Sequence, residues 1–104
     1  MTTTVAETFK ALGDPVRLEI IERLSNGTNY SLGTVSKDLG ITRQGARKHL
    51  QVLADAKIIT MESIGRQTTI IFDTQALAAA NVFMENLSRK WDERLEALRD
   101  FVEE

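Results

Sequence analysis

The feature that most constrains this chain is a break between two short helical patterns near its middle. Val35 and Leu39 have the spacing of one helix, and Gly40-Ile41-Thr42 interrupts it before a second helix that carries several basic residues. Two β-rich runs then flank Gly65-Arg66, as in a hairpin. Two helices joined by a tight turn, the second one basic and followed by a two-stranded ribbon, form a winged helix-turn-helix, a fold that binds DNA.

The basic helix of this unit has one apolar and one polar side. Ala46, Leu50 and Leu53 repeat at intervals of four and three residues, which places them on a single inward stripe. Thr42 is the expected N-cap, and the helix should end near Ala56. The side chains that then face outward are Arg43, Gln44, Arg47, Lys48 and Gln51. This face is the predicted DNA-binding surface.

Two further helices are predicted before this unit. The first covers about residues 3–12 and has an apolar stripe of Val5, Phe9 and Leu12. The second begins at Asp14-Pro15, because aspartate is a favoured N-cap and proline costs nothing in the first turn, and it ends at Asn26-Gly27. Its stripe comprises Val16, Ile20, Ile21 and Leu24. Residues 30–32 are then expected to be extended, and a short third helix is expected over residues 34–39.

After the fourth helix the pattern changes from helix to strand. Residues 57–63 and 68–72 are β-rich, and residues 64–67 join them, with Gly65 available for a positive φ. Asp73-Thr74 can cap a last helix, which is predicted over about residues 75–102 because no helix-breaking residue follows. Its apolar residues recur at a spacing of about 3.5, and they are Leu77, Ala80, Met84, Leu87, Trp91, Leu95, Leu98 and Phe101.

The last helix is too long and too apolar on one side for so small a domain to cover. We expect its stripe to pack against a second copy of the chain in a two-fold homodimer. The residues of this stripe that are expected at the contact are Met84, Leu87, Trp91, Leu95 and Leu98. The alternative is that all of them enter the core of a single chain. Trp91 is more typical of an interface core than of a ligand pocket.

Composition excludes several classes of function. The 104 residues suffice for a single domain, residues 1–104, with one core. There is no cysteine and one histidine, His49, so no disulfide, metal site or cofactor is predicted, and His49 is expected to make a structural hydrogen bond. Without a Gly-rich phosphate loop or a catalytic cluster, the chain is not expected to be an enzyme. The absence of a long apolar run and of a signal peptide predicts a cytoplasmic protein with no membrane partner.

The net charge of −2 conceals a basic middle segment. Residues 1–36 carry three Lys or Arg against four Asp or Glu, and residues 67–104 carry four against eight. Residues 37–66 reverse this balance, with six basic against three acidic residues. Phosphate responds to the local field rather than to the net charge. We therefore expect residues 30–72 to be the DNA-binding part.

The outward residues of the basic helix differ in what they can recognise. Arg43 and Arg47 lie one turn apart, and a guanidinium can bond guanine O6 and N7 together. Gln44 can bond adenine in the same bidentate way. These three residues are expected to contact bases, with contact to phosphate alone, or to solvent, as the alternative.

The remaining polar residues are better suited to the DNA backbone. Lys37 and Lys48 are expected on phosphates, because an ammonium is a point charge without planar selectivity. Thr42 can cap its helix and also lie near a phosphate. Arg66, at the hairpin tip, is expected to enter a minor groove, although a solvent-exposed tip is the plainer alternative.

Three stretches carry a family resemblance. Residues 11–21 (ALGDPVRLEII), residues 41–53 (ITRQGARKHLQVL) and Gly65-Arg66 resemble the ArsR/SmtB-type winged-helix repressors of bacteria, over nearly the whole chain. Residues 91–98 are similar to the last helix of cysteine-free members. The resemblance implies four helices, two strands and a last helix. It also implies a homodimer formed by the first and last helices, about residues 3–12 and 75–102, with Val5 and Phe9 of the first helix at the contact. It further implies a fourth helix that recognises DNA, and repression by occupying an operator.

The chain departs from this family where the founding members bind metals. Those members use cysteines on the third helix, or histidine and acidic ligands on the last one. Here residues 34–38 contain no cysteine and the last helix contains no histidine, so metal sensing is not inferred, and no residue identifies a small-molecule effector. We predict a homodimeric repressor of double-stranded DNA with a palindromic operator. The alternative is a protein-interaction module that keeps the fold without specific DNA binding.

Overall fold

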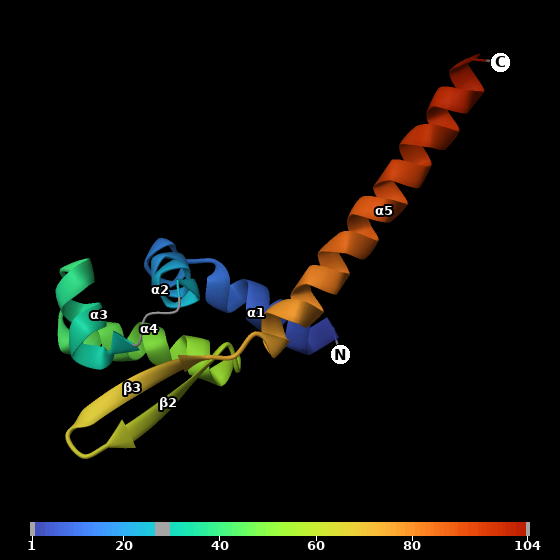
Figure 1. Cartoon of the computed structure of the whole chain (residues 1–104). Helices are drawn as coiled ribbons and strands as arrows, with labels where there is room; N and C mark the ends of the chain where they lie inside the picture. The colour runs from blue at the N-terminus through green and yellow to red at the C-terminus, as the bar shows by residue number, and fades with distance from the viewer. Residues whose placement is uncertain (1, 27–29, 104) are drawn as a thin grey trace.

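The computed structural model describes residues 2–26 and 30–103 and has the predicted order of helices and hairpin (Figure 1). The helices are α1 (Thr2–Leu12), α2 (Pro15–Ser25), α3 (Leu32–Leu39), α4 (Arg43–Asp55) and α5 (Gln75–Glu103). The strands are β1 (Tyr30–Ser31), β2 (Ile59–Ile64) and β3 (Gln67–Phe72). The fold is therefore mainly helical with a small antiparallel sheet, as the sequence predicts.

The helix starts follow from their capping residues. The Asp14 carboxylate accepts the backbone N–H groups of Val16 at 2.8 Å and Arg17 at 3.2 Å, and Pro15 is the first residue of α2. Asn26 caps the other end of α2 as predicted, whereas Gly27, the other half of that predicted stop, lies outside the described residues. Asp73 accepts the N–H of Gln75 at the start of α5, which confirms the predicted cap there.

The core forms where α2, α3, α4 and the sheet meet. Ala46, Leu50 and Leu53 are each fully buried, which confirms the inward stripe of the basic helix. The other buried apolar residues packed with them are Ala11, Ile20, Leu24, Tyr30, Leu32, Val35, Ala56, Ile58, Ile59 and Ile70. The outward side of α4 is thereby turned away from the core, because the opposite side of the same helix is fully occupied.

The sheet has the order β1-β3-β2, with antiparallel neighbours. Tyr30 pairs with Ile70, so β1 extends the predicted two-stranded ribbon by a third short strand. Ile64 pairs with Gln67, which leaves Gly65 and Arg66 as the turn of the hairpin, and Gly65 has the positive φ of 64° expected of it. The predicted four-residue connection is thus too long, because its outer residues belong to the strands.

Two predicted boundaries are wrong for local reasons. Leu32 is helical rather than extended, because Ser31 caps α3 by accepting the N–H of Thr34 at 3.2 Å. The helix therefore begins at Leu32 instead of Thr34. Strand β2 begins at Ile59 instead of Lys57, because Lys57 takes a left-handed φ of 63° and its N–H bonds the carbonyl of Ala54, closing α4.

Helix α5 gives the protein its elongated shape, 69 × 27 × 22 Å along the principal axes. The radius of gyration is 18.3 Å, whereas a compact domain of 100 residues has about 13 Å. The N-terminal part of α5 packs on α1, where Ala80 is buried and the Phe83 ring meets Phe9 edge to face at 6.0 Å between centroids. The rest of α5 projects away from the body, as the orange-to-red helix in Figure 1 shows.

The projecting part of α5 leaves its apolar stripe uncovered. The predicted contact residues Met84, Leu87, Trp91, Leu95 and Leu98 are all exposed, Trp91 by 62 %. The alternative that these side chains enter the core of a single chain is therefore wrong. Val5 and Phe9, from α1, are half-buried within the chain. Within the described residues, no helix has both the length and the apolarity to cross a lipid bilayer.

Candidate nucleic-acid interface

The turn between α3 and α4 is held by the backbone and one serine. Gly40 ends α3 with a left-handed φ of 64°, a conformation that a residue with a Cβ rarely adopts. The N–H of Ile41 bonds the carbonyl of Ser36 at 3.1 Å, and the Ser36 hydroxyl donates to the carbonyl of Ile41 at 2.6 Å. These reciprocal bonds set the direction in which α4 leaves the turn.

The start of α4 depends on a close contact between a cap and a glycine. The Thr42 hydroxyl accepts the N–H of Gly45 at 2.9 Å, which confirms Thr42 as the N-cap. A Cβ at Gly45 would lie 3.1 Å from that hydroxyl oxygen, closer than ordinary side-chain contacts. Glycine at this position therefore leaves room for the cap, although glycine inside a helix costs about 1 kcal/mol relative to alanine.

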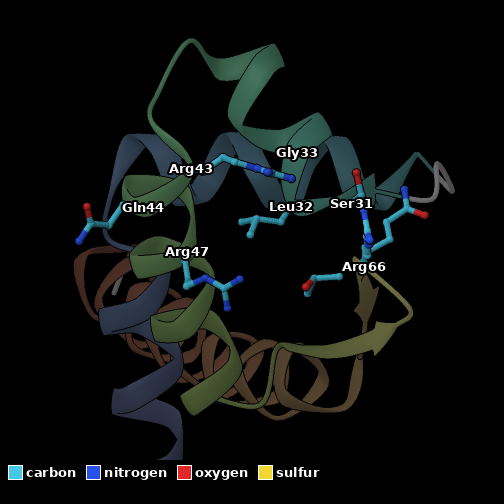
Figure 2. Close-up of a pocket in the computed structure, with 9 residues that line it drawn as sticks. Ser31, Leu32, Gly33, Arg43, Gln44, Arg47 and Arg66 are labelled. Atoms are coloured by element: carbon cyan, nitrogen blue, oxygen red, sulfur yellow. The ribbon is translucent and has the colours of Figure 1, made fainter.

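A cleft of about 390 Å³ opens between the start of α3, the outward side of α4 and the hairpin (Figure 2). It is lined by Ser31, Leu32 and Gly33 from the start of α3, by Arg43, Gln44 and Arg47 from α4, and by Arg66, Gln67 and Thr68 from the hairpin. The fold thus brings four of the predicted DNA-binding residues to one place, from two segments that are 19 or more residues apart in the sequence.

The arginines of this cleft lack a negative neighbour. Among the described residues, no aspartate or glutamate lines the cleft, and Arg43, Arg47 and Arg66 take part in none of the ion pairs. The first turn of α3, which carries the positive end of the helix dipole, forms one wall. Three cations and a helix N-terminus around one cleft make it attractive to anions.

The other four predicted residues lie outside this cleft. Thr42, Lys37 and Lys48 have exposed side chains. Gln51 is also exposed, and its amide donates to the Asp55 carboxylate at 2.8 Å. The structure therefore divides the eight predicted residues into a cleft group and a surrounding exposed group, and DNA contact by each of them stays a prediction.

The part of the cleft that comes from α3 is not predicted from the sequence. Ser31 and Leu32 belong to the segment that is predicted to be extended, and Gly33 lies between that segment and the predicted third helix, so no role is predicted for these residues. A usable signal was present: Leu32, Val35 and Leu39 have helical spacing, and Ser31 stands where an N-cap belongs. Gln67 and Thr68 were missed because a hairpin pattern does not indicate which side of a ribbon faces a neighbouring helix.

A second set of contacts attaches the inner edge of α4 to α1 and α2. The Arg17 guanidinium donates to the carbonyl of Ala11 at 2.6 Å and lies 3.2 Å from His49 Nδ1. This contact confirms the predicted structural hydrogen bond of His49. The Asp14 carboxylate is 3.9 Å from the same Nδ1. The pKa of the Asp14 carboxyl lies below its ordinary value. The main cause is the hydrogen bond that this carboxylate accepts from the backbone N–H of Arg17.

A third set of contacts joins α2 to α3. Arg23 bonds Glu19 at 3.0 Å on its own helix and reaches Asp38 of α3 at 3.6 Å. A side-chain hydrogen bond with Tyr30 is the main cause that raises the pKa of Arg23. Both helices of the helix-turn-helix are therefore attached to α2. Helix α3 is attached through Arg23, and helix α4 is attached through Arg17.

Comparison with known proteins identifies the family. A family model described as a helix-turn-helix domain matches residues 12–62, which span α2 to most of β2. The HTH-type transcriptional regulator YuzN of Bacillus subtilis (strain 168) is 36 % identical over 91 residues, covering 82 % of this chain and 91 % of YuzN. The solved structure of an ArsR-like transcriptional regulator from Rhodococcus sp. RHA1 superposes with a TM-score of 0.85 at 27 % identity, covering 97 % of this chain and 92 % of that one. The chain belongs to the ArsR-type winged helix-turn-helix transcriptional regulators.

Membership of the ArsR-type family confirms the resemblance drawn from residues 11–21 and 41–53. The protein is a DNA-binding transcription regulator, and the family is not a class of enzymes, as predicted. The transcriptional repressor SdpR of Bacillus subtilis (strain 168) is also similar, with 28 % identity over 87 residues, covering 84 % of this chain and 96 % of SdpR. Within the described residues, no group of three His, Cys, Asp or Glu side chains is placed to hold a metal ion.

Proposed function

We propose that this ArsR-type regulator is a repressor that binds a palindromic operator as a homodimer. The observation that carries the proposal is the cleft in which Arg43, Arg47 and Arg66 gather without a carboxylate among the described residues. DNA supplies the missing negative charge, and neutralising each phosphate releases condensed counterions. Helix α4 would enter the major groove, with the β2-β3 hairpin beside it on the backbone and the minor groove.

Within this interface, Gln44 and Arg47 are the proposed base contacts. Both belong to the first turns of α4, the part of a recognition helix that meets base edges in helix-turn-helix proteins. A bidentate contact contributes about 1–3 kcal/mol of discrimination against a wrong base. The proposed backbone contacts are Lys37, Thr42, Lys48 and Gln51, and Arg66 is the proposed minor-groove contact from the hairpin.

The uncovered stripe of α5 supports the homodimer. Nine large apolar side chains of this helix are exposed, namely Val82, Phe83, Met84, Leu87, Trp91, Leu95, Leu98, Phe101 and Val102. Six of them recur at intervals of three and four residues and so share one side of the helix, namely Met84, Leu87, Trp91, Leu95, Leu98 and Val102. An exposed apolar surface of this kind marks an interaction site, and a two-fold axis lets the same stripe face itself. The dimer would present two α4 helices to half-sites about 34–36 Å apart, one turn of B-DNA.

Repression follows from occupancy of such a site, since a bound dimer excludes other proteins from the same DNA. The similarity to the repressor SdpR supports repression rather than activation. Binding to chromosomal DNA would place the protein in the cytoplasm. No described residue favours a particular small-molecule effector, and the proposal includes none.

The test is selection of duplex DNA from a random-sequence pool, followed by binding of the recovered duplex and of a random duplex at several salt concentrations. We expect a palindrome with half-site centres about 10 base pairs apart, and a steep loss of affinity as salt rises. Arg47→Ala should lower affinity for the recovered duplex by tenfold or more and leave the protein folded. The control is Arg89→Ala, which removes one exposed positive charge from α5, away from the cleft.

Two outcomes would refute the proposal. Recovery of no enriched sequence, together with weak binding to every duplex, would favour a protein-interaction module. Recovery of a single, non-repeated half-site by a monomeric protein would remove the dimer and keep the DNA contact.

A further inference from the structure

We infer that Arg43 binds a DNA phosphate rather than a base, and that Gly33 of α3 is the positioning residue that allows its guanidinium to do so. This inference rests on the proposed entry of α4 into the major groove. It assigns a role to one arginine of the interface and adds a residue from outside the recognition helix.

The direction of the Arg43 side chain is the first observation. Arg43 begins α4, and its Nη2 lies 3.3 Å from the place where a Cβ at Gly33 would be. Figure 2 shows this side chain extended from α4 toward Gly33, while Gln44 points the other way. The guanidinium therefore lies against the first turn of α3 instead of projecting from the outer face of α4, where base edges would lie.

The charges around Arg43 are the second observation. Its guanidinium lies at the positive end of the α3 dipole, in a cleft that also contains Arg47 and Arg66 and that no described carboxylate lines. A base edge is neutral and would leave this accumulation of positive charge unbalanced. A phosphate carries the charge that balances it, and phosphate is the common target of arginine side chains and helix N-termini on DNA.

The presence of glycine at position 33 is the third observation. Gly33 is the second residue of α3 and is not among the glycines with a positive φ, so its backbone conformation does not require glycine. Glycine is also a poor helix former. What it provides is space, because a methyl group there would press on the Arg43 guanidinium and on any phosphate bound beside it. The close approach of a ligand to a backbone is a recognised reason for glycine.

The test compares variants on two probes, the duplex selected from the random pool by the wild-type protein and a random duplex of equal length. Arg43→Ala should weaken binding to both probes by a similar factor. The logarithm of the association constant falls linearly with the logarithm of the salt concentration, and the loss of one phosphate contact makes this slope less steep by about 0.9. Between 50 and 200 mM salt, the wild-type protein should thus lose about 3.5-fold more affinity per protomer than the variant.

Conservative variants separate the two roles of an arginine. Arg43→Lys should keep most of the affinity and the salt slope, because an ammonium still binds phosphate, whereas a bidentate base contact would be lost. Gln44→Ala, as the matched base-contact control, should weaken binding to the selected duplex alone. Arg89→Ala controls for the loss of one positive charge and should leave both affinities unchanged.

Gly33→Ala tests the positioning role. The guanidinium is the far end of a flexible side chain, so it can move aside and the variant should fold with a melting temperature equal to or above that of the wild-type protein. The affinity of this variant for both probes should nevertheless fall. Its affinity should also depend less steeply on salt concentration, as is expected for Arg43→Ala. In the Arg43→Ala background the same substitution should add much less, because its effect acts through Arg43.

The outcomes are distinguishable from failure of the proposed function. A tenfold loss on the selected duplex alone in Arg43→Ala would make Arg43 a base contact and overturn the inference. Wild-type affinity and slope in Gly33→Ala would remove the positioning role. Failure of the proposed function would appear in the wild-type protein itself, as no selected sequence and no salt dependence.

Discussion

Trp91 offers the sharpest test of the dimer, because it is the only tryptophan of the chain and is 62 % exposed in the single protomer. A tryptophan side chain presents up to about 250 Å², so the exposed fraction corresponds to roughly 150 Å². At about 25 cal/mol per Å², burying this area in a dimer contributes up to about 4 kcal/mol per protomer. Trp91→Ala keeps only a small part of that area, so about 3 kcal/mol per protomer should be lost.

A loss of about 3 kcal/mol raises a dissociation constant at least a hundredfold, and each dimer contains two copies of the substitution. Sedimentation equilibrium of wild-type protein and Trp91→Ala measures this change directly. Tryptophan fluorescence of the wild-type protein gives an independent signal, since indole emission moves to shorter wavelength in apolar surroundings. The emission should be blue-shifted at high protein concentration and should return to that of exposed indole on dilution, with the same midpoint as the sedimentation data.

The control is Lys90→Ala, the adjacent residue, which removes an exposed polar side chain from the same turn of α5. The dissociation constant of the Lys90→Ala dimer should differ little from that of the wild-type dimer. The reasoning would be refuted if Trp91→Ala dimerised as tightly as the wild-type protein, or if the emission of the wild-type dimer were that of solvent-exposed indole. Either result would place the two-fold contact elsewhere than on the α5 stripe.

Two further predictions concern stability. Leu53→Ala, at a fully buried position on α4, should lower the free energy of unfolding by about 2–5 kcal/mol. Urea titration should show a lower unfolding midpoint, while the dependence of the unfolding free energy on urea concentration stays the same. An unchanged midpoint would contradict the core assignment. In the folded protein the pKa of Asp14 is lowered from 3.8, mainly by the N–H of Arg17. The ionised carboxylate therefore stabilises the folded state fully above pH 3.8, the pKa in the unfolded chain. This stabilisation is lost as the pH falls through the lower pKa of the folded state. Asp14→Ala should therefore lower the melting temperature at pH 7 and have a smaller effect near pH 2, and an equal effect at both pH values would contradict this linkage.

The elements that local rules predict well are those with strong caps or strong periodicity. Asp14-Pro15 marks the start of α2, and Gly40-Ile41-Thr42 marks the turn, because each residue satisfies a specific backbone requirement. The inward stripe of α4 was predictable because its three apolar positions allow only one buried face. The winged-helix fold follows from the order of these elements.

The errors occur where one residue overrides a pattern. Lys57 resembles a strand residue in sequence, yet it closes α4 with a positive φ that lysine rarely adopts. Leu32 follows a tyrosine and a serine that do form a strand, and only the Ser31 cap reveals that the helix begins there. Local propensity could not decide either case, because the competing conformations differ by the contacts of a single residue.

The sequence predicts four of the nine residues that line the cleft, namely Arg43, Gln44, Arg47 and Arg66, and it does not predict how their side chains are arranged. Helical periodicity places Arg43, Gln44 and Arg47 on the outward side of α4, but it treats their side chains as equivalent. The difference between Arg43 and Gln44 arises because Gly33, ten residues earlier and on another helix, offers a surface without a side chain. Such a contact depends on how α3 and α4 cross, which no single-helix pattern contains.

The proposed dimer and DNA surfaces are connected by a series of side-chain contacts that runs through α1 and α2. Phe83 of α5 packs on Phe9 of α1, and the carbonyl of Ala11 in the same helix accepts the Arg17 guanidinium. Arg17 in turn contacts His49 on α4.

A two-fold dimer binds successive major grooves only if its two recognition helices stay about 34–36 Å apart. A loose attachment of α4 to α5 would spread that separation over several ångströms and weaken binding to any one spacing. The hydrogen bonds of Arg17 limit this freedom because they attach α4 to α1, the helix on which α5 packs. If the proposed dimer binds DNA in this way, Arg17 and His49 would support recognition by fixing where α4 lies, although neither lines the cleft.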